Sequence, residues 1–251
     1  MKTLKKPTIL NLAIGLIISI FKSAINKSRI DVAPQWIGKY KLIAPVKKEN
    51  FFREYSIGIY KYKNEKVFIK SWNGFIKDFE YYELINEYFI NKTLYKMFNV
   101  HDHIKVPKII SYIDEKGSFS IIYEFIDGKH LSYFPRKKQI ETISAVLNVF
   151  NCLSTSLTEK ESKYISKRTL KFYIPSLTFL SILTILSDLR SFRVVLQSYI
   201  NFLKGISCVK KDNLTIAHRD LSLHNILVKG KYVFLLDCAR VILTYKDYDT
   251  A

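Results

Sequence analysis

Glycine, proline and cysteine are scarce in this chain of 251 residues, with eight, six and three copies. The cysteines, Cys152, Cys208 and Cys238, are odd in number and show no Cys-x-x-Cys spacing. The sequence therefore indicates neither a disulfide framework nor a zinc site, and a reducing compartment fits it.

No internal repeat or low-complexity linker interrupts the chain. A composition of 48% apolar and 25% charged residues is typical of a globular protein, not a disordered one.

The N-terminal apolar stretch, Ile9 to Phe21, is shorter than the ~20 residues that a membrane-spanning helix needs. Lysines precede and follow it, as around the apolar part of a signal peptide, but no Ala-x-Ala-like cleavage site is evident. Two interpretations stay open for this segment. It is either a helix that lies on a membrane surface or a helix that packs on the fold.

Acidic residues are also few, because 22 Asp and Glu face 40 Lys and Arg, which gives a formal net charge of +18. Such a surplus predicts attraction to polyanions such as nucleic acid, anionic lipid or phosphorylated glycan. The basic residues are scattered along the chain, so a solvated lysine-rich surface explains them equally well.

The first half of the chain is rich in strand-like stretches. They are Tyr40–Val46, Glu54–Tyr62, Val67–Ser71, Pro107–Tyr112 and Phe119–Phe125. Between the third and fourth stretches, apolar positions recur at helical spacing and predict a helix over Tyr82–Met97. We therefore expect an antiparallel sheet with one helix in this part of the chain.

A helix-rich region is expected after the turn at Asp127-Gly128. Its predicted helices are Arg136–Leu157, Pro175–Leu189 and Phe192–Leu203. The expected organisation is thus an N-terminal apolar and basic segment, a sheet-containing lobe and a short helical lobe. Their bounds are 1–37, 38–126 and 127–251.

The segment IAHRDLSLHNILVKGKYVFLLDCAR, residues 216–240, carries the clearest functional signal. Asp220 and Asn225 stand five positions apart in an H-R-D-L-x-x-x-N string, and Asp237 follows the predicted strand Tyr232–Leu236. This order and spacing are typical of the catalytic loop and metal-binding strand of kinase-like phosphotransferases. The sequence therefore predicts phosphoryl transfer.

Five polar residues of this segment have expected roles in phosphoryl transfer. Asp220 orients the acceptor hydroxyl, with removal of its proton as a further role. Asn225 and Asp237 offer oxygen atoms to Mg²⁺, a cation that prefers oxygen ligands. His218 and Arg219 brace the catalytic loop.

The nucleotide would be held by earlier parts of the chain. Lys70, in V-F-I-K on the third predicted strand, is placed to contact the α- and β-phosphates of ATP. A helix glutamate holds this lysine, either Glu87 or its competitor Glu83 one turn earlier. The backbone of the hinge residues Glu124, Phe125 and Ile126 is expected to bind adenine, although an ordinary buried strand that ends in a turn explains the same local sequence.

One expected part is missing, since none of the eight glycines forms G-x-G-x-x-G between the first two strands. If the segment from Lys47 to Phe52 covers the phosphates, it does so with side chains such as that of Lys48. This weakens a protein-kinase assignment and is compatible with the wider phosphotransferase fold.

Three stretches resemble the lipopolysaccharide core kinases, the Kdo and heptose kinases of a small bacterial branch of the protein-kinase-like superfamily. They are Val67–Trp72 with Lys70, Asn86-Glu87-Tyr88, and His218–Val241 with its D-C-A-R-V ending. The resemblance implies a bilobal α+β protein-kinase-like fold with a small, mostly helical C-lobe. It also implies transfer from ATP, with Mg²⁺, to a sugar hydroxyl of an anionic lipid-linked core oligosaccharide. Its implied location is the cytoplasmic face of the inner membrane, with peripheral contact to anionic lipid and no specific nucleic acid.

Two other functions stay open beside this one. The first is a small-molecule phosphotransferase that acts on an aminoglycoside or a choline-like compound. The second is a catalytically weak pseudokinase that serves as a binding module. The short tail after Asp237 leaves no room in this sequence for the A-P-E string and helices that position a peptide, so a protein substrate is not expected. The oligomeric state stays open.

Overall fold

The computed structural model describes residues 4–25, 33–46, 55–74, 76–98, 101, 103–115, 117–159, 163–168, 174–175, 177–178, 181–182, 184–185, 188, 190, 192–206 and 214–245. The chain divides into two units. Met1–Ile143 and Asp220–Arg240 form the first, and Ser144–Arg219 and Val241–Ala251 form the second. Each unit is described by itself.

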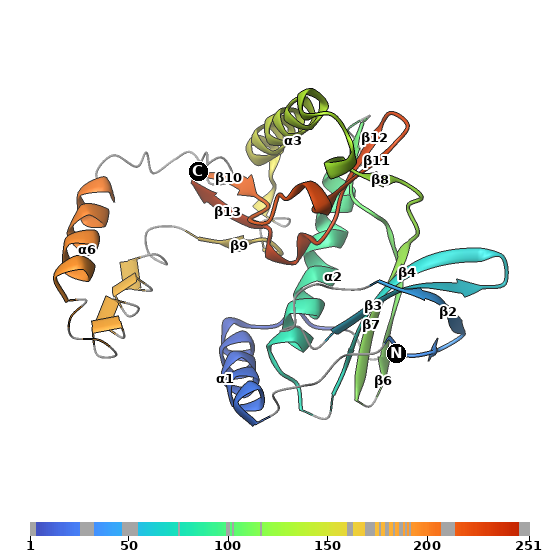
Figure 1. Ribbon diagram of the computed structural model, residues 1–251, viewed down its shortest axis with the longest axis horizontal. Coiled ribbons are helices and arrows are strands. Elements are labelled where there is room, and N and C mark those ends of the chain that lie inside the picture. The colour runs from blue at the N-terminus through green and yellow to red at the C-terminus, as the bar shows by residue number, and fades with distance from the viewer. Residues whose placement is uncertain are drawn as a thin grey trace. The chain divides into compact units, whose positions relative to one another are not determined.

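A six-stranded antiparallel sheet forms the frame of the first unit (Figure 1). In spatial order its strands are β1 (Trp36–Ile37), β2 (Tyr40–Pro45), β3 (Tyr55–Tyr62), β4 (Glu65–Asn73), β7 (Ser118–Glu124) and β6 (Ile109–Glu115). The two-residue turn between β3 and β4 has Lys63 at φ 54°, the left-handed backbone that such tight hairpin turns require. Five of these strands lie where the apolar pattern predicts them, within two or three residues, and the two-residue β1 is additional.

Helix α2 (Phe79–Phe98) covers one face of this sheet, in agreement with the predicted helix over Tyr82–Met97. Its apolar side packs with Trp72, Phe119 and Ile121 of the sheet in one buried cluster. The fully buried Asp78 fixes the start of the helix, because its Oδ1 accepts hydrogen bonds from Trp72 Nε1 at 2.7 Å and from the Tyr81 amide at 3.2 Å. One carboxylate thus caps the helix and ties it to β4.

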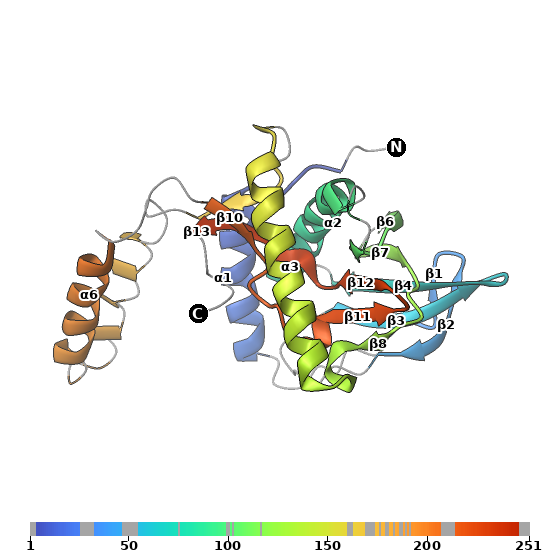
Figure 2. The same cartoon turned by 90° about the horizontal axis from the view of Figure 1, so that it is seen from above.

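The N-terminal apolar stretch forms α1 (Ile9–Ile25), which lies beside the first turn of α2 in both Figure 1 and Figure 2. Ser19 Oγ donates to Glu80 Oε2 at 2.8 Å and accepts from the Phe79 amide at 3.1 Å. One side of α1 therefore packs on the fold, as the second interpretation of this segment expects. The opposite side exposes Leu10 and Ile14. None of the helices in the described ranges is long and apolar enough to cross a membrane.

A second sheet of the first unit joins segments from the middle of the chain with segments near its C-terminal end. Its order is β5 (Ile104–Lys105), β12 (Tyr232–Leu235), β11 (Ile226–Lys229) and β8 (Lys129–His130). Because β8 pairs with β11, the chain just after Gly128 belongs to the first unit. The first segment of this unit ends at Ile143, and the lobe boundary expected between residues 126 and 127 stays a prediction.

The second unit contains both helix and sheet. Helix α3 (Arg136–Ser156) leads into it from the first unit, and α6 (Phe192–Ile206) follows, as predicted. Of the expected helix over Pro175–Leu189, eight residues are described, and all of them except Asp188 are helical. A three-stranded sheet, β10 (Leu214–Ala217), β13 (Ile242–Tyr245) and β9 (Ser166–Lys167), was not expected in a mostly helical lobe. The Ile216 amide donates to Ser154 Oγ at 2.7 Å and so anchors β10 to α3.

The contact between α1 and α2 leads to a stability prediction. A Cβ on Gly15 would lie 2.8 Å from the Phe79 amide nitrogen, and backbone cannot move aside as a flexible side chain can. We expect Gly15→Ala to lower the free energy of unfolding by about 1–3 kcal/mol, although alanine is the better helix former. Thermal unfolding measures this change. Ala13→Gly, at an exposed position of α1, reports helix propensity alone. A more stable Gly15→Ala protein would contradict the close α1–α2 approach.

Candidate active site

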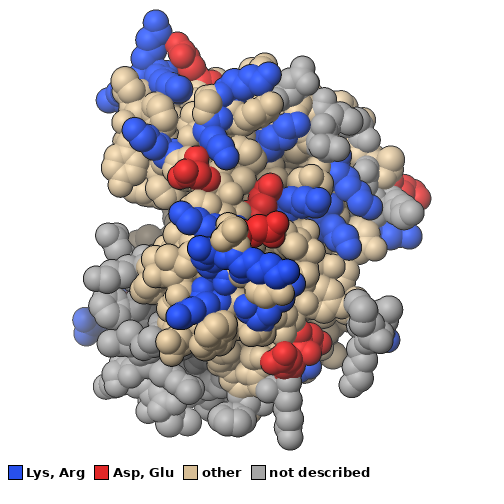
Figure 3. Space-filling view, turned by 90° about the vertical axis from the view of Figure 1, so that its right-hand side faces the viewer, with Lys and Arg blue, Asp and Glu red and all other residues tan. Residues whose placement is uncertain are grey.

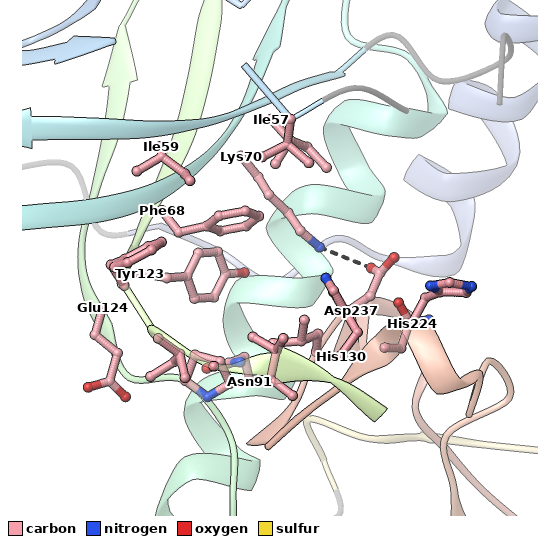
Figure 4. A pocket seen from close by; sticks show the side chains of 18 of the residues that line it. Ile57, Ile59, Phe68, Lys70, Asn91, Tyr123, Glu124, His130, His224 and Asp237 are labelled. Carbon is pink, nitrogen blue, oxygen red and sulfur yellow. Dashed lines mark hydrogen bonds and ion pairs between the residues drawn. The ribbon is translucent and has the colours of Figure 1, made fainter. Parts of the chain in front are cut away.

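A cavity of about 550 Å³ lies within the first unit (Figure 4). Its roof consists of Ile57, Ile59 and Phe68 on β3 and β4. The chain from Glu124 to Gly128 and the hairpin ends of β11 and β12 complete the wall. This volume is within the ~300–1,000 Å³ of small-molecule sites, and a mostly apolar wall with a few converging polar groups is typical of them.

Lys70 places a buried positive charge in this cavity. Its Nζ lies 2.6 Å from Glu87 Oε1 and 3.0 Å from Asp237 Oδ1, and only 5% of the residue is exposed. Between the two glutamates considered for this lysine, the structure selects Glu87. Glu83 instead meets Arg240, whose Nε lies 3.3 Å from Glu83 Oε1. Arg240 thus ties the turn after Asp237 to α2.

Glu87 is held from a second side by Tyr123, whose hydroxyl donates to Oε1 at 3.0 Å. Burial raises the pKa of Glu87, Lys70 opposes this shift, and Asp237 adds to it. Burial and the neighbouring Glu87 raise the pKa of Tyr123 well above its ordinary value, so the phenol keeps the proton that it donates. The buried thiol of Cys238 beside this group also has a raised pKa, chiefly through burial.

Asn225 and Asp237, the two expected metal ligands, lie together because β11 and β12 form a hairpin. Ile226 pairs with Leu235 at the open end of the hairpin, so the next residues outward, Asn225 and Leu236, lie side by side. There the Leu236 amide donates to the Asn225 carbonyl at 2.8 Å. Asp237 has φ 53°, a left-handed backbone that costs free energy in a non-glycine residue and is characteristic of functional sites.

The catalytic loop contributes Asp220 to the first unit. Asn225 Nδ2 donates to the Asp220 carbonyl at 2.9 Å, so the amide oxygen of Asn225 is the atom of this side chain that could accept a metal ion. Asp220 is partly exposed and is not among the residues that line the cavity. The structure therefore places its backbone beside Asn225, while its role toward an acceptor stays a prediction.

His218 and Arg219 belong to the second unit. The His218 ring is fully buried and stacks on Phe150 with centroids 6.5 Å apart and an interplanar angle of 18°. Arg219 has a left-handed φ of 66°. Both features are expected of residues that fix the conformation of the catalytic loop. That role of His218 and Arg219 stays a prediction. Lys48 and the segment expected to cover the phosphates lie outside the described residues.

The hinge residues Glu124, Phe125 and Ile126 all line the cavity. The Glu124 amide already donates to the Lys108 carbonyl at 2.9 Å, and the Ile126 carbonyl accepts from the Gly128 amide at 3.0 Å. The Ile126 amide has no backbone acceptor among the described residues. This amide is therefore a suitable donor for a nucleotide base, which refines the expectation for the hinge.

Sequence reasoning did not assign several polar residues of the cavity to the site, among them Asn91, His130 and His224. Asn91 Oδ1 and His130 Nδ1 are buried and have no hydrogen-bond partner in the described part of the chain. Asn91 follows Glu87 by four residues on α2, so helical spacing alone places both on one face. No sequence signal indicates His130, since its position depends on the pairing of β8 with β11.

The fold is similar to that of several solved phosphotransferases. A spectinomycin phosphotransferase in complex with ADP and spectinomycin superposes with a TM-score of 0.52 at 16% identity, over 83% of this chain and 67% of that one. The GDP complex of an aminoglycoside 2′-phosphotransferase gives 0.60 at 15% identity, over 83% and 70%. An aminoglycoside phosphotransferase from Streptomyces rimosus gives 0.51 at 8% identity, over 94% and 81%. No family model and no curated protein matches the sequence. These similarities confirm the kinase-like α+β fold.

The buried charges around Lys70 generate a prediction about stability and pH. Lys70→Met leaves Glu87 buried without its cation, which should cost about 3 kcal/mol at neutral pH. The pKa of Glu87, already raised by burial, then rises further. A carboxyl whose folded-state pKa exceeds its unfolded value favours the folded state at low pH and loses that advantage as pH rises. The deficit of Lys70→Met should therefore shrink as pH falls and be smallest at the acid end of the range, below about pH 5.

Thermal unfolding of the single and double variants from acid to neutral pH measures this effect. The double variant Lys70→Met/Glu87→Gln has no buried carboxylate at this position and should recover part of the lost stability. A deficit that does not change with pH, or that the second substitution deepens, would contradict the arrangement.

Proposed function

We propose that this protein is a phosphotransferase that moves the terminal phosphoryl group of ATP to a hydroxyl of a small molecule, with Mg²⁺ as the metal. The convergence of Lys70, Glu87 and Asp237 on one cavity carries this proposal, since Lys70 Nζ lies 2.6 Å and 3.0 Å from the two carboxylates. These residues come from β4, α2 and the end of β12, and Asp237 follows the H-R-D-L-x-x-x-N string in the expected order.

The residues of the cavity suit a magnesium nucleotide. Among the described residues no group of three or more His, Cys, Asp or Glu side chains is placed to hold a metal. A metal here would be held by Asn225 and Asp237 and would take its other ligands from phosphate and water, as Mg²⁺ commonly does. When bound, it would neutralise charge on the transferring phosphoryl group. The Ile126 amide and the ring of Phe68 in the roof suit the base.

The protein groups perform complementary tasks in this scheme. Lys70 supplies a fixed cation for the non-transferred phosphates, and Glu87 with Tyr123 fixes its position. Asp220 orients the acceptor hydroxyl for attack and takes its proton as the phosphoryl group is transferred. The Asn225–Asp220 hydrogen bond couples the metal-binding end of the hairpin to the catalytic loop.

A small-molecule acceptor has more support than a lipopolysaccharide core sugar. The solved structures with this fold include proteins named for spectinomycin and aminoglycoside phosphorylation. A core-sugar acceptor is supported by the motif resemblance alone. The two acceptors also differ in charge, since the glycan is anionic and an aminoglycoside is cationic. A basic acceptor site would suit an anionic glycan, and an acidic one would suit a cationic drug.

Two substitutions test the assigned roles. Asp220→Asn should abolish transfer while ATP still binds, since the residue acts on the acceptor. Asp237→Asn should remove the Mg²⁺-dependent part of nucleotide binding. A thermal-shift titration with ATP, with and without Mg²⁺, and a phosphate-transfer assay measure these effects. Asp114→Asn on β6, an exposed carboxylate away from the cavity lining, is the matched control. Full turnover in either variant would mean that the roles are wrong.

The acceptor is identified by a transfer assay with radiolabelled ATP or GTP against aminoglycosides, choline-like amines, core oligosaccharide and a polypeptide in parallel. Transfer to an aminoglycoside or amine supports the proposal. Transfer to the core sugar alone would replace the small-molecule acceptor with the glycan. A protein that shows no thermal shift at millimolar nucleotide would be a pseudokinase or another binding module.

A further inference from the structure

Three lysines stand side by side across the strands of the large sheet. Lys41 on β2 is paired with Lys61 on β3, and Lys61 with Lys66 on β4. The row ends at two aromatic rings, since Lys41 is paired with Trp36 on β1 and Lys66 Nζ lies 5.7 Å from the ring centre of Phe125. We call Lys41, Lys61 and Lys66 the lysine row.

This arrangement disfavours the folded state. Side chains directly opposite each other on neighbouring strands lie only ~5 Å apart at Cβ, and like charges there repel. All three lysines are exposed, and no described carboxylate forms an ion pair with any of them. Their described side-chain contacts are with the rings of Trp36 and Phe125. A row of unneutralised cations that costs stability indicates an anionic partner.

The row continues the roof of the cavity. Along β3 and β4 the successive pairs are Ile57 with Lys70, Ile59 with Phe68, and Lys61 with Lys66. Because alternate residues of a strand point to the same side, the lysine row is on the face that carries the cavity. The β3–β4 hairpin projects to the right in Figure 1, and the surface seen from that side in Figure 3 carries many Lys and Arg side chains and few carboxylates.

Exposed apolar side chains accompany the row. On the same edge of the sheet, Trp36 is 56% exposed and Ile43 is 49% exposed. Nucleic acid has phosphates for lysine and bases for tryptophan, but it offers little to exposed aliphatic side chains. A bilayer surface offers all three: anionic headgroups, the interfacial zone in which tryptophan concentrates, and hydrocarbon below.

We propose that the lysine row, with Trp36 and Ile43, docks this protein on a bilayer that is rich in anionic lipids. Each lysine near such a surface strengthens binding by a factor of about five. Docking through this row places the hinge side of the cavity, at Phe125, next to the headgroups. The surface is separate from Asp220 and Asp237, so the docking does not depend on the proposed chemistry.

Sedimentation with vesicles tests this proposal on the full chain. The protein should bind vesicles of phosphatidylcholine with about one third phosphatidylglycerol, should bind vesicles of phosphatidylcholine alone far less, and should be released by salt. Lys61→Glu should weaken binding at least about fivefold. Lys229→Glu, the same charge change at an exposed position on β11 that pairs with Tyr232, is the matched control and should change binding far less.

A second measurement separates docking from misfolding. Lys61→Glu puts a carboxylate between two lysines, so its melting temperature should rise by about 1–4 °C while lipid binding falls. Loss of stability is then no explanation for weaker binding. Ile43→Ser should lower the binding that persists at high salt, which is the apolar part.

Some outcomes would overturn the proposal. These are absence of binding to the anionic vesicles, or equal effects of Lys61→Glu and Lys229→Glu. Binding of an unstructured RNA oligonucleotide that Lys61→Glu abolishes, without vesicle binding, would assign the row to nucleic acid instead.

Discussion

The ion triad that buried Lys70 and Glu87 form with the partly exposed Asp237 is the constraint on which the rest of the first unit depends. Lys70 comes from β4, Glu87 from α2 and Asp237 from the end of β12, so one ammonium group joins three elements. Buried charges are stable only when they are paired, so none of these elements can shift without exposing a charge to an apolar interior.

Other contacts hold the helix that carries Glu87 in place. Asp78 caps α2 and binds Trp72, α1 packs on its first turn, and Arg240 pairs with Glu83 further along. The first turns of the helix are therefore tied both to the sheet and to the turn that follows Asp237. The Lys70–Glu87 contact therefore depends on contacts in several parts of the first unit and not only on these two side chains.

The elements with long, periodic apolar patterns were predictable from the sequence. The strands β2, β3, β4, β6 and β7 and the helices α2, α3 and α6 all lie close to their predicted ranges. The two-residue strands β1, β5, β8 and β9 were not, because so short a segment becomes a strand only through its partner. The site residues divide in the same way. The motif indicated Asp220, Asn225 and Asp237, whereas His130 has no local signal.

By itself the sequence determined the kind of fold and predicted a reaction class, because both reside in residue type, spacing and order along the chain. Only the tertiary structure decided between Glu83 and Glu87 as the partner of Lys70. The two glutamates are one turn apart on α2, and they differ only in the cation that each one faces, Arg240 or Lys70. It also decided which lysines form a row, because strand register brings residues 41, 61 and 66 together while their sequence positions do not.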